Sequence, residues 1–360
     1  MEPSVGPDLD GEAAGDQSGW SIAMSADGSV VAIGAPLNDG GGEGGTGFSG
    51  AGHVRAYAAV MHASPPALPP PLPPAPLGGY SPPPLPPPPF HVTVARYEQL
   101  GDDIDGEAVE DYSGYSVALS ADGSVVAVGA PYNDGSGTTA GHVRVHDLVG
   151  TQWVQRGDDI DGEATGDRSG CSVALSADGI VVAIGATHNG GGGSEAGHVR
   201  VHAWDNTQWD QRGNDIDGEA VGDQSGISVA LSADGTVVAI GARDNGGAGD
   251  WVGHARVHAW DGTQWGQRGD DLDGEAAWDE SGYSVALSAD GSVVAIGARN
   301  NDATGTNAGH VRVRARDGTQ WHQVGEDLDG EASGDVSGPF SHMVGPIVYT
   351  RPRLLVRVSY

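Results

Sequence analysis

Residues 103–130 read DIDGEAVEDYSGYSVALSADGSVVAVGA, an acidic loop followed by two short Val- and Ala-rich runs that a tight turn separates. From this copy onward, the Asp-Ile/Leu-Asp-Gly-Glu signature that opens the stretch recurs every 56 residues. Its copies begin at Asp8, Asp103, Asp159, Asp215, Asp271 and Asp327. A fixed period near 50 residues is typical of solenoids, propellers and other repeat arrays. We therefore expect a single repeat array.

Each repeat contains four short runs typical of β-strands and shows no helical period. In the second copy, residues 115–120 and 125–130 are joined by Ser-Ala-Asp-Gly, whose glycine suits a left-handed position in a short hairpin. Residues 141–146 alternate as a third strand, and residues 150–156 supply a turn and a fourth strand that carries Trp153. Four short strands per repeat predict an all-β fold, a β-propeller of four-stranded blades. A β-sandwich is the main alternative.

The blades are expected to occupy residues 1–338. Five copies are complete, whereas residues 339–360 depart from the pattern and form at most a partial sixth blade, so the ring is expected to be incomplete. An insertion at residues 64–89 holds 15 of the 22 prolines. Proline lacks a backbone donor and cannot join a sheet, so we expect a disordered, extended polyproline segment there. A domain that binds polyproline is the partner such a segment fits.

Composition excludes several classes of partner. The chain has no lysine, and its 17 arginines face 49 acidic residues, which gives a net charge of −32. This charge argues against binding to nucleic acid or to an anionic membrane surface. No apolar run approaches the roughly 18 residues that a membrane span needs, so no membrane insertion is expected. The N-terminus has no visible signal peptide, and Cys171 is the only cysteine. These features do not indicate in which cellular compartment the protein works.

The first two strands of each copy carry a resemblance to a known family. Ser113-Gly-Tyr-Ser-Val-Ala-Leu119 followed by Val126-Ala-Val-Gly-Ala-Pro131 resembles the FG-GAP repeat of integrin α-chain propellers. The unit is also similar to the short FG-GAP-type repeats of microbial and algal proteins, over roughly residues 8–338. The resemblance implies a non-catalytic binding or adhesion module at the cell surface or outside the cell, with a protein or glycan ligand. Serine replaces the Phe of Phe-Gly, and the family's calcium loop is replaced by the tight turn.

The acidic loops are a separate candidate for a metal site. Their carboxylates fall at positions 1, 3, 5 and 9 of each copy. The candidate ligands are Asp103, Asp105, Glu107, Asp111, Asp159, Asp161, Glu163, Asp167, Asp215, Asp217, Glu219, Asp223, Asp271, Asp273, Glu275 and Asp279. Alternating oxygens around a glycine-containing bend suit Ca²⁺, with a dissociation constant of about 10⁻⁴–10⁻³ M. Alternatively, the carboxylates cap backbone N–H groups without any ion.

The histidines and the Gly-rich loops complete the list of candidates. His142 and His146, with their repeats, share one face of the third strand, and we interpret them as structural because an arginine between them opposes a cation. The Gly-rich loops between the second and third strands differ among copies, and loops on a rigid scaffold commonly carry recognition. The predicted ligand anchors on these and the acidic loops are Tyr132, His188, Trp251 and Trp278.

No unique catalytic set stands out in the sequence. A group repeated at one register in every blade is normally structural or multivalent, whereas a catalytic site is a single asymmetric constellation. We therefore expect that the protein is not an enzyme. The alternatives are an enzyme or enzyme accessory domain with its active groups in one irregular loop, and a non-functional repeat fragment.

Overall fold

The computed structural model describes residues 8–38, 50–63, 92–246, 250–337, 348–350 and 353–355. The Pro-rich insertion expected at residues 64–89 lies outside the described residues, as does most of 339–360. The described part of the chain contains strands and no helix, and hence no helix that could cross a membrane.

Five antiparallel sheets follow one another along the chain, each built from four strands that pair in chain order. The first strands are β1 (Ser21–Met24), β6 (Ser116–Leu119), β11 (Ser169–Leu175), β16 (Ser228–Leu231) and β21 (Ser281–Leu287). The second strands are β2 (Val30–Ala35), β7 (Val125–Ala130), β12 (Val181–Ala186), β17 (Val237–Ala242) and β22 (Val293–Ala298). The third strands are β3 (His53–Ala63), β8 (His142–Val149), β13 (His198–Trp204), β18 (His254–Trp260) and β23 (His310–Asp317). The fourth strands are β4 (Val92–Gln99), β9 (Gln152–Gln155), β14 (Trp209–Gln211), β19 (Trp265–Gln267) and β24 (Gln320–Gln323).

A two-residue strand from the following acidic loop joins each sheet by pairing with its third strand. These short strands are β5 (Ile104–Asp105), β10 (Ile160–Asp161), β15 (Ile216–Asp217), β20 (Leu272–Asp273) and β25 (Leu328–Asp329). Near the C-terminus, β26 (Val348–Thr350) and β27 (Arg353–Leu355) pair only with each other among the described strands. A sixth blade over residues 339–360 therefore stays a prediction.

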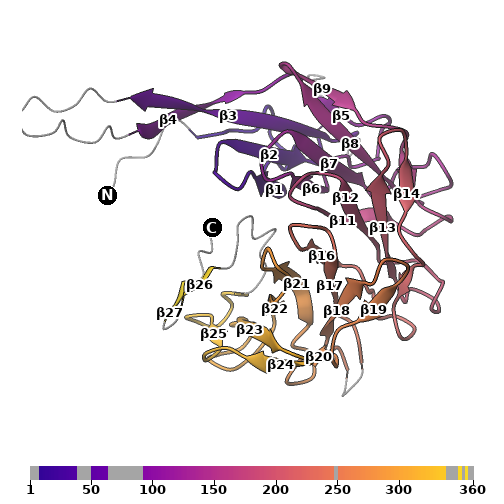
Figure 1. The fold of residues 1–360 in the computed structure, drawn as a ribbon, viewed down its shortest axis with the longest axis vertical. Helices are drawn as coiled ribbons and strands as arrows, with labels where there is room; N and C mark the ends of the chain where they lie inside the picture. The colour runs from indigo at the N-terminus through magenta and orange to yellow at the C-terminus, as the bar shows by residue number, and fades with distance from the viewer. Residues whose placement is uncertain are drawn as a thin grey trace, which may run out of the picture.

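The sheets are arranged as the blades of a propeller. In Figure 1 they follow one another around a common centre, with the first strands innermost and the fourth strands outermost. The first strands of successive sheets contact each other in the order β1, β6, β11, β16, β21. The prediction of an all-β propeller of four-stranded blades is confirmed.

The hairpin between the first two strands forms because the Ser-Ala-Asp-Gly turn satisfies its own polar groups. In the second blade, the Ser120 hydroxyl donates to the Asp122 carboxylate at 2.7 Å and accepts from the Val125 N–H at 2.9 Å. Gly123 adopts a φ of 70°, the left-handed conformation that glycine takes at low cost. The same serine and aspartate pattern recurs in the other four blades.

The hydrophobic cores lie between blades rather than within them. One cluster joins Val54 of the first blade to Val117 and Val126 of the second, and every residue of the second strand β7 is buried. A blade exposes little of its first two strands, since it is covered on both faces by its neighbours. This explains why these runs are apolar without alternation.

Polar contacts between blades are also regular. The Ser116 hydroxyl donates to the Gly170 carbonyl of the next blade at 2.8 Å, and the Ala121 N–H donates to the Ala177 carbonyl at 2.9 Å. The second contact is repeated from Ala26 through to Ala289, so one line of hydrogen bonds runs through all five blades. This line surrounds an apolar cavity of about 200 Å³ lined by alanine, leucine and valine of the first strands. The opposite end of the same strands carries polar side chains.

Candidate functional site

The acidic loops and the Gly-rich loops lie side by side on one face of the propeller. The Trp278 N–H of an acidic loop donates to the Asp250 carbonyl of the preceding Gly-rich loop at 2.9 Å, and the Glu280 N–H donates to the Trp251 carbonyl at 3.1 Å. The acidic loop is held by its apolar second residue, since Ile104 is buried and pairs with Val54 of β3. Each acidic loop is thus attached to two blades, its own and the preceding one.

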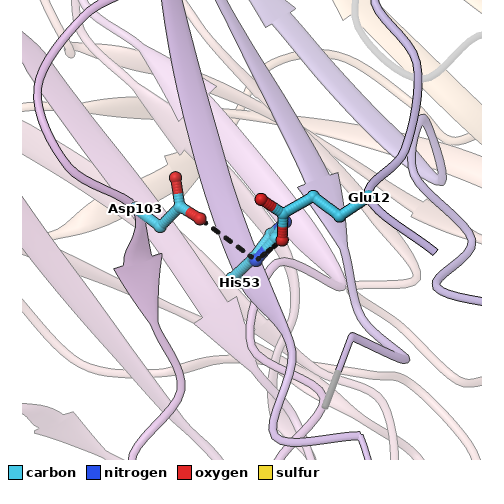
Figure 2. Close-up of side chains that lie close together, drawn as sticks. All are labelled: Glu12, His53 and Asp103. Atoms are coloured by element: carbon cyan, nitrogen blue, oxygen red, sulfur yellow. Dashed lines mark ion pairs between the residues drawn. The ribbon is translucent and has the colours of Figure 1, made fainter. Parts of the chain in front are cut away.

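This attachment brings a histidine and two carboxylates together in every blade. Figure 2 shows the first case, in which Glu12 and Asp103 from successive acidic loops approach the His53 imidazole of β3. Their oxygens lie 3.9 and 3.7 Å from His53 Nδ1. The described residues contain five such Glu–His–Asp clusters, in which one ligand atom from each member lies within 4.8 Å of the others. The clusters are Glu12/His53/Asp103, Glu107/His142/Asp159, Glu163/His198/Asp215, Glu219/His254/Asp271 and Glu275/His310/Asp327.

The clusters combine a buried imidazole with carboxylates that reach solvent. His142 is 1% exposed, whereas Glu107 is 45% exposed in its side chain. Burial lowers the pKa of His142; Asp159 acts against this shift, and Arg144 adds to it. Burial likewise lowers the pKa of His198, His254 and His310. Neutral imidazole beside two carboxylates is a donor set that a divalent metal ion can use.

The structure divides the predicted calcium ligands of one loop among different places. The glutamates at position 5 (Glu107, Glu163, Glu219, Glu275) face the histidine of their own blade, and the aspartates at position 1 (Asp103, Asp159, Asp215, Asp271) face the histidine of the preceding blade. The aspartates at position 3 (Asp105, Asp161, Asp217, Asp273) are exposed. The four carboxylates of a single loop therefore do not converge on one point.

The aspartates at position 9 are buried and hold the loop together. Asp111 is 3% exposed, and its carboxylate accepts from the Ala108 N–H and from the Asn133 side chain, both at 2.9 Å. Equivalent bonds serve Asp167, Asp223 and Asp279. These carboxylates cap backbone N–H groups, which is the arrangement that the sequence left open as the alternative to an ion.

A second group of polar residues gathers where the first strands begin and the second strands end, on the inner side of the propeller. The residues are Tyr115, His188, Arg243, Asp244, Glu280, Tyr283 and Arg299, and we call them the axial cluster. The Arg243 and Arg299 guanidinium groups lie 5.6 and 4.3 Å from the centre of the Tyr283 ring. Arg299 Nε is 2.7 Å from the buried Glu280 carboxylate, and Arg243 Nε is 3.4 Å from Asp244. Two blades thus place two cations over one aromatic ring.

Titration behaviour shows that further blades act on this cluster. Burial, with smaller contributions from Cys171, Tyr132 and Tyr283 and against that of Arg243, raises the pKa of Tyr115 to about 12. Burial also lowers the pKa of His188, assisted by Arg168, and raises the pKa of Asp244. A neutral imidazole, a carboxyl that holds its proton more tightly and two guanidinium groups are the kinds of group that acid–base chemistry uses.

The four predicted ligand anchors fall into two groups. Tyr132 and His188 lie at the axis: the Tyr132 ring contacts Tyr112 with centroids 4.9 Å apart, and His188 Nδ1 is 3.0 Å from Thr187 Oγ1. Trp251 and Trp278 form a pair of their own, with ring centroids 4.8 Å apart and exposures of 47% and 54%. Ligand binding by these four residues stays a prediction.

Sequence reasoning missed Tyr115, Arg243, Tyr283 and Arg299, although a signal was present. Two positions differ among copies whose flanking residues are nearly constant. One comes just before the serine repeated in each first strand (Trp20, Tyr115, Cys171, Ile227, Tyr283), and the other comes just after each second strand (Pro36, Pro131, Thr187, Arg243, Arg299). Variation at a fixed register within otherwise constant strands marked the axis. Sequence reasoning also missed the Glu–His–Asp clusters, because their carboxylates come from two different loops.

Comparison with known proteins adds to the description of the fold. No protein-family model matches the chain, and no curated protein sequence does. The periplasmic gluconolactonase of Pseudomonas aeruginosa has a similar structure, with a TM-score of 0.51 and 17% identity over 87% of this chain and 73% of that one. The hydrazine synthase of Kuenenia stuttgartiensis (TM-score 0.49, 13% identity, 89% and 69% covered) and a 6-phosphogluconolactonase of Bacteroides uniformis (0.47, 10%, 86% and 85%) are more distant. At these identities the likeness concerns the fold.

One sequence-based prediction has to be corrected on this evidence. The FG-GAP resemblance implies a non-catalytic binding or adhesion module, and the lack of a unique catalytic set predicts that the protein is not an enzyme. The gluconolactonase structure shows that an enzyme shares this fold. The prediction of a non-catalytic adhesion module is overturned by that finding, and the alternative of an enzyme with irregular active groups agrees better with the axial cluster.

Proposed function

We propose that this protein is a hydrolase whose active site is the axial cluster. The observation that carries this proposal is the asymmetry of the cluster. The Glu–His–Asp clusters recur in each blade, whereas the axial cluster combines different side chains from different blades around one point. Active sites concentrate titratable groups whose pKa values are shifted apart, as they are for His188, Asp244 and Tyr115.

The groups present suit the hydrolysis of an ester. With its pKa lowered, His188 is neutral at pH 7 and could accept a proton from a water molecule as the water oxygen bonds to the ester carbonyl carbon. The Arg243 and Arg299 guanidinium groups would stabilise the negative charge that develops on the carbonyl oxygen. The carbon–oxygen bond to the alcohol then breaks, the alcohol oxygen takes the proton from His188, and the carboxylic acid so formed releases its proton to solvent and leaves as a carboxylate.

The surroundings favour a sugar-like substrate with a cyclic ester. Tyr132 at the axis and the exposed pair Trp251 and Trp278 offer aromatic faces on which a sugar ring could lie, so all four predicted anchors become contacts of a carbohydrate ligand. A glycan is accordingly favoured over a protein as the ligand. Because the Pseudomonas aeruginosa protein of this fold is named a gluconolactonase, aldonolactones are the first substrates to test.

Proton release provides a direct test. The full chain is incubated with aldonolactones and simple esters at pH 7.5, and the acid formed is followed with an indicator dye. We expect hydrolysis above the buffer rate, and a kcat about 10²–10⁴-fold lower in His188→Gln. His322→Gln is the matched control, because His322 is exposed and contacts only Asp317 among the described residues. No hydrolysis by the unaltered chain, or equal rates in the two variants, would refute the proposal.

Two finer predictions remain proposals. We propose that the repeat is of the FG-GAP type, which the positions of Gly114 and Gly129 support: a Cβ at Gly129 would lie 2.2 Å from the Gly170 carbonyl of the next blade. Related chains with Phe at the place of Ser113 would strengthen this proposal. Weak calcium binding by the acidic loops likewise stays a proposal, supported by their carboxylates and tested by calorimetry with millimolar Ca²⁺.

A further inference from the structure

In two of the Glu–His–Asp clusters, those of His198 and His310, the imidazole Nδ1 is a buried nitrogen that no hydrogen bond explains. His198 is 1% exposed and His310 is fully buried, yet the Nδ1 atom of each has no hydrogen-bond partner among the described residues. His198 Nδ1 points toward Asp215 at 3.7 Å and Glu163 at 3.9 Å. Both distances exceed those of hydrogen bonds. A buried polar atom without a partner costs free energy and calls for an explanation.

A metal ion accounts for both the separation and the direction of these atoms. Ligands bound at about 2.0–2.2 Å to one ion lie roughly 3 to 4 Å from each other, depending on the angle between them. The 3.7 and 3.9 Å distances from His198 Nδ1 fall in this range. The two nitrogen–oxygen separations thus suit a single ion, and the two carboxylate oxygens lie within 4.8 Å of each other.

The nearby arginine does not oppose a cation in the way the sequence indicated. Arg200 NH1 is 3.9 Å from Glu163 Oε1, and Arg200 NH2 donates to the Asp161 backbone carbonyl. The arginine therefore faces one oxygen of the glutamate, while the other oxygen, Oε2, faces His198. Two carboxylates and one guanidinium leave the cluster with a negative charge, which a divalent cation would neutralise.

The donor set selects the class of metal. Ca²⁺ binds oxygen ligands, whereas imidazole nitrogen together with carboxylate oxygen suits Zn²⁺ and similar transition-metal ions. We propose that each of the five Glu–His–Asp clusters binds a divalent transition-metal ion such as Zn²⁺, held by one imidazole and two carboxylates. Each ion joins the acidic loops of two successive blades through the third strand between them. The ions then stabilise the propeller, and this role does not depend on the proposed hydrolase activity.

Metal counting on the full chain tests the inference. The metal-free protein is equilibrated with Zn²⁺ alone, freed of loosely bound metal by gel filtration, and analysed by elemental mass spectrometry. We expect five equivalents of zinc for the five clusters and a higher melting temperature than in chelator. Glu163→Gln, which alters a half-exposed side chain, is expected to lose one equivalent. Glu110→Gln is the matched control, since Glu110 is an exposed acid of an acidic loop that belongs to none of the clusters.

Each result bears on the proposal. Loss of one equivalent in Glu163→Gln, with the full number kept in Glu110→Gln, supports it. Zinc binding that is absent, or equally reduced in both variants, overturns it. A parallel experiment with Ca²⁺ separates the metal classes: if Ca²⁺ binds in the same number and displaces Zn²⁺ at equal concentration, the clusters are calcium sites and the transition-metal assignment is wrong.

Discussion

The two ends of the first strands differ in how strictly their residues repeat from blade to blade. At one end, the Ser-Ala-Asp-Gly turns and the ring of alanines are nearly identical in all five blades and enclose an apolar cavity. At the other end, the residues just before the serine that these strands repeat are an indole, two phenols, a thiol and an aliphatic side chain. Identical side chains around an axis can only build a symmetric lining. Different side chains at the same register can build a single asymmetric site.

Comparing the repeats of this one chain distinguishes residues of the scaffold from residues of the proposed site. Ser116 and Trp209 recur with the period, and four of the five blades make the Trp209 contact, so removal of either side chain should affect stability. Residues such as Arg243 and Arg299 break the period and should affect activity. The predictions below test this division, beginning with the repeated positions.

The largest loss of stability is expected in acid, where the second histidine of the third strands becomes protonated on unfolding. Burial lowers the pKa of His146, His202 and His258 to about 4, with the neighbouring arginines as the next cause. Since the unfolded chain binds these protons near pH 6.5, the stability is present above about pH 6.5 and is lost as the pH falls toward 4. Each histidine changes the free energy of unfolding by up to about 1.4 kcal/mol per pH unit. The three together change it by roughly 4 kcal/mol per pH unit. Urea unfolding between pH 7 and 4.5 measures the slope.

The variant His202→Gln isolates one of these contributions. It should reduce the slope between pH 6 and 5 by about 1.4 kcal/mol per unit, because one group no longer takes up a proton on unfolding. His322→Gln, on an exposed histidine, should leave the slope unchanged. An unaltered slope in His202→Gln would show that carboxylates, and not the repeated histidines, govern the acid sensitivity.

The close contact between blades makes Gly129 the next most sensitive position. A Cβ there would lie 2.2 Å from the Gly170 carbonyl and 2.3 Å from the Ser116 hydroxyl. Both neighbours belong to strands buried between blades, so Gly129→Ala should destabilise the protein by about 3 kcal/mol. Gly266→Ala is the matched control in a strand with open space around the Cβ, and it should be neutral or slightly stabilising. Equal melting temperatures for the two variants would contradict this account of the packing.

Most of the fold could be predicted from the sequence because the period is visible there. The four runs per copy, the turn at residues 120–123 and the apolar faces follow from local chemistry that every copy repeats. Ile104, the apolar second residue of its acidic loop, is buried against the preceding blade.

The sites were harder to predict from the sequence than the fold, because each site combines residues from different repeats. Glu107 and Asp103 stand in one loop but face different histidines, since the loop crosses from one blade to the next. The axial cluster needs the curvature of the whole propeller to bring His188 and Tyr283 near one point. A period identifies what each blade shares, whereas these contacts depend on how blades are placed around the axis.

The buried loop aspartates should give an intermediate effect. Asn133→Ala removes the side-chain donor to the Asp111 carboxylate and the acceptor for the Gly135 N–H. The carboxylate keeps its bond from the Ala108 N–H but stays buried, so we expect a loss of about 1–3 kcal/mol. Urea unfolding in chelator measures it without any contribution from metal. If excess Ca²⁺ restored full stability to the variant, Asp111 would be acting as an ion ligand and not as a cap.

The smallest stability effect is expected at the exposed tryptophan pair, where the comparison between scaffold and site is sharpest. Trp209 recurs with the period, packs against a core cluster and donates from Nε1 to the Arg156 carbonyl at 2.9 Å, so Trp209→Ala should cost about 3 kcal/mol. Trp278 breaks the period and is 54% exposed, and Trp278→Ala should change the unfolding free energy by no more than about 0.5 kcal/mol. If Trp278 contacts the substrate, its removal should instead raise KM for a sugar lactone. A loss of stability comparable to that of Trp209→Ala would show that the pair supports the loops and that irregular positions on this face belong to the scaffold as well.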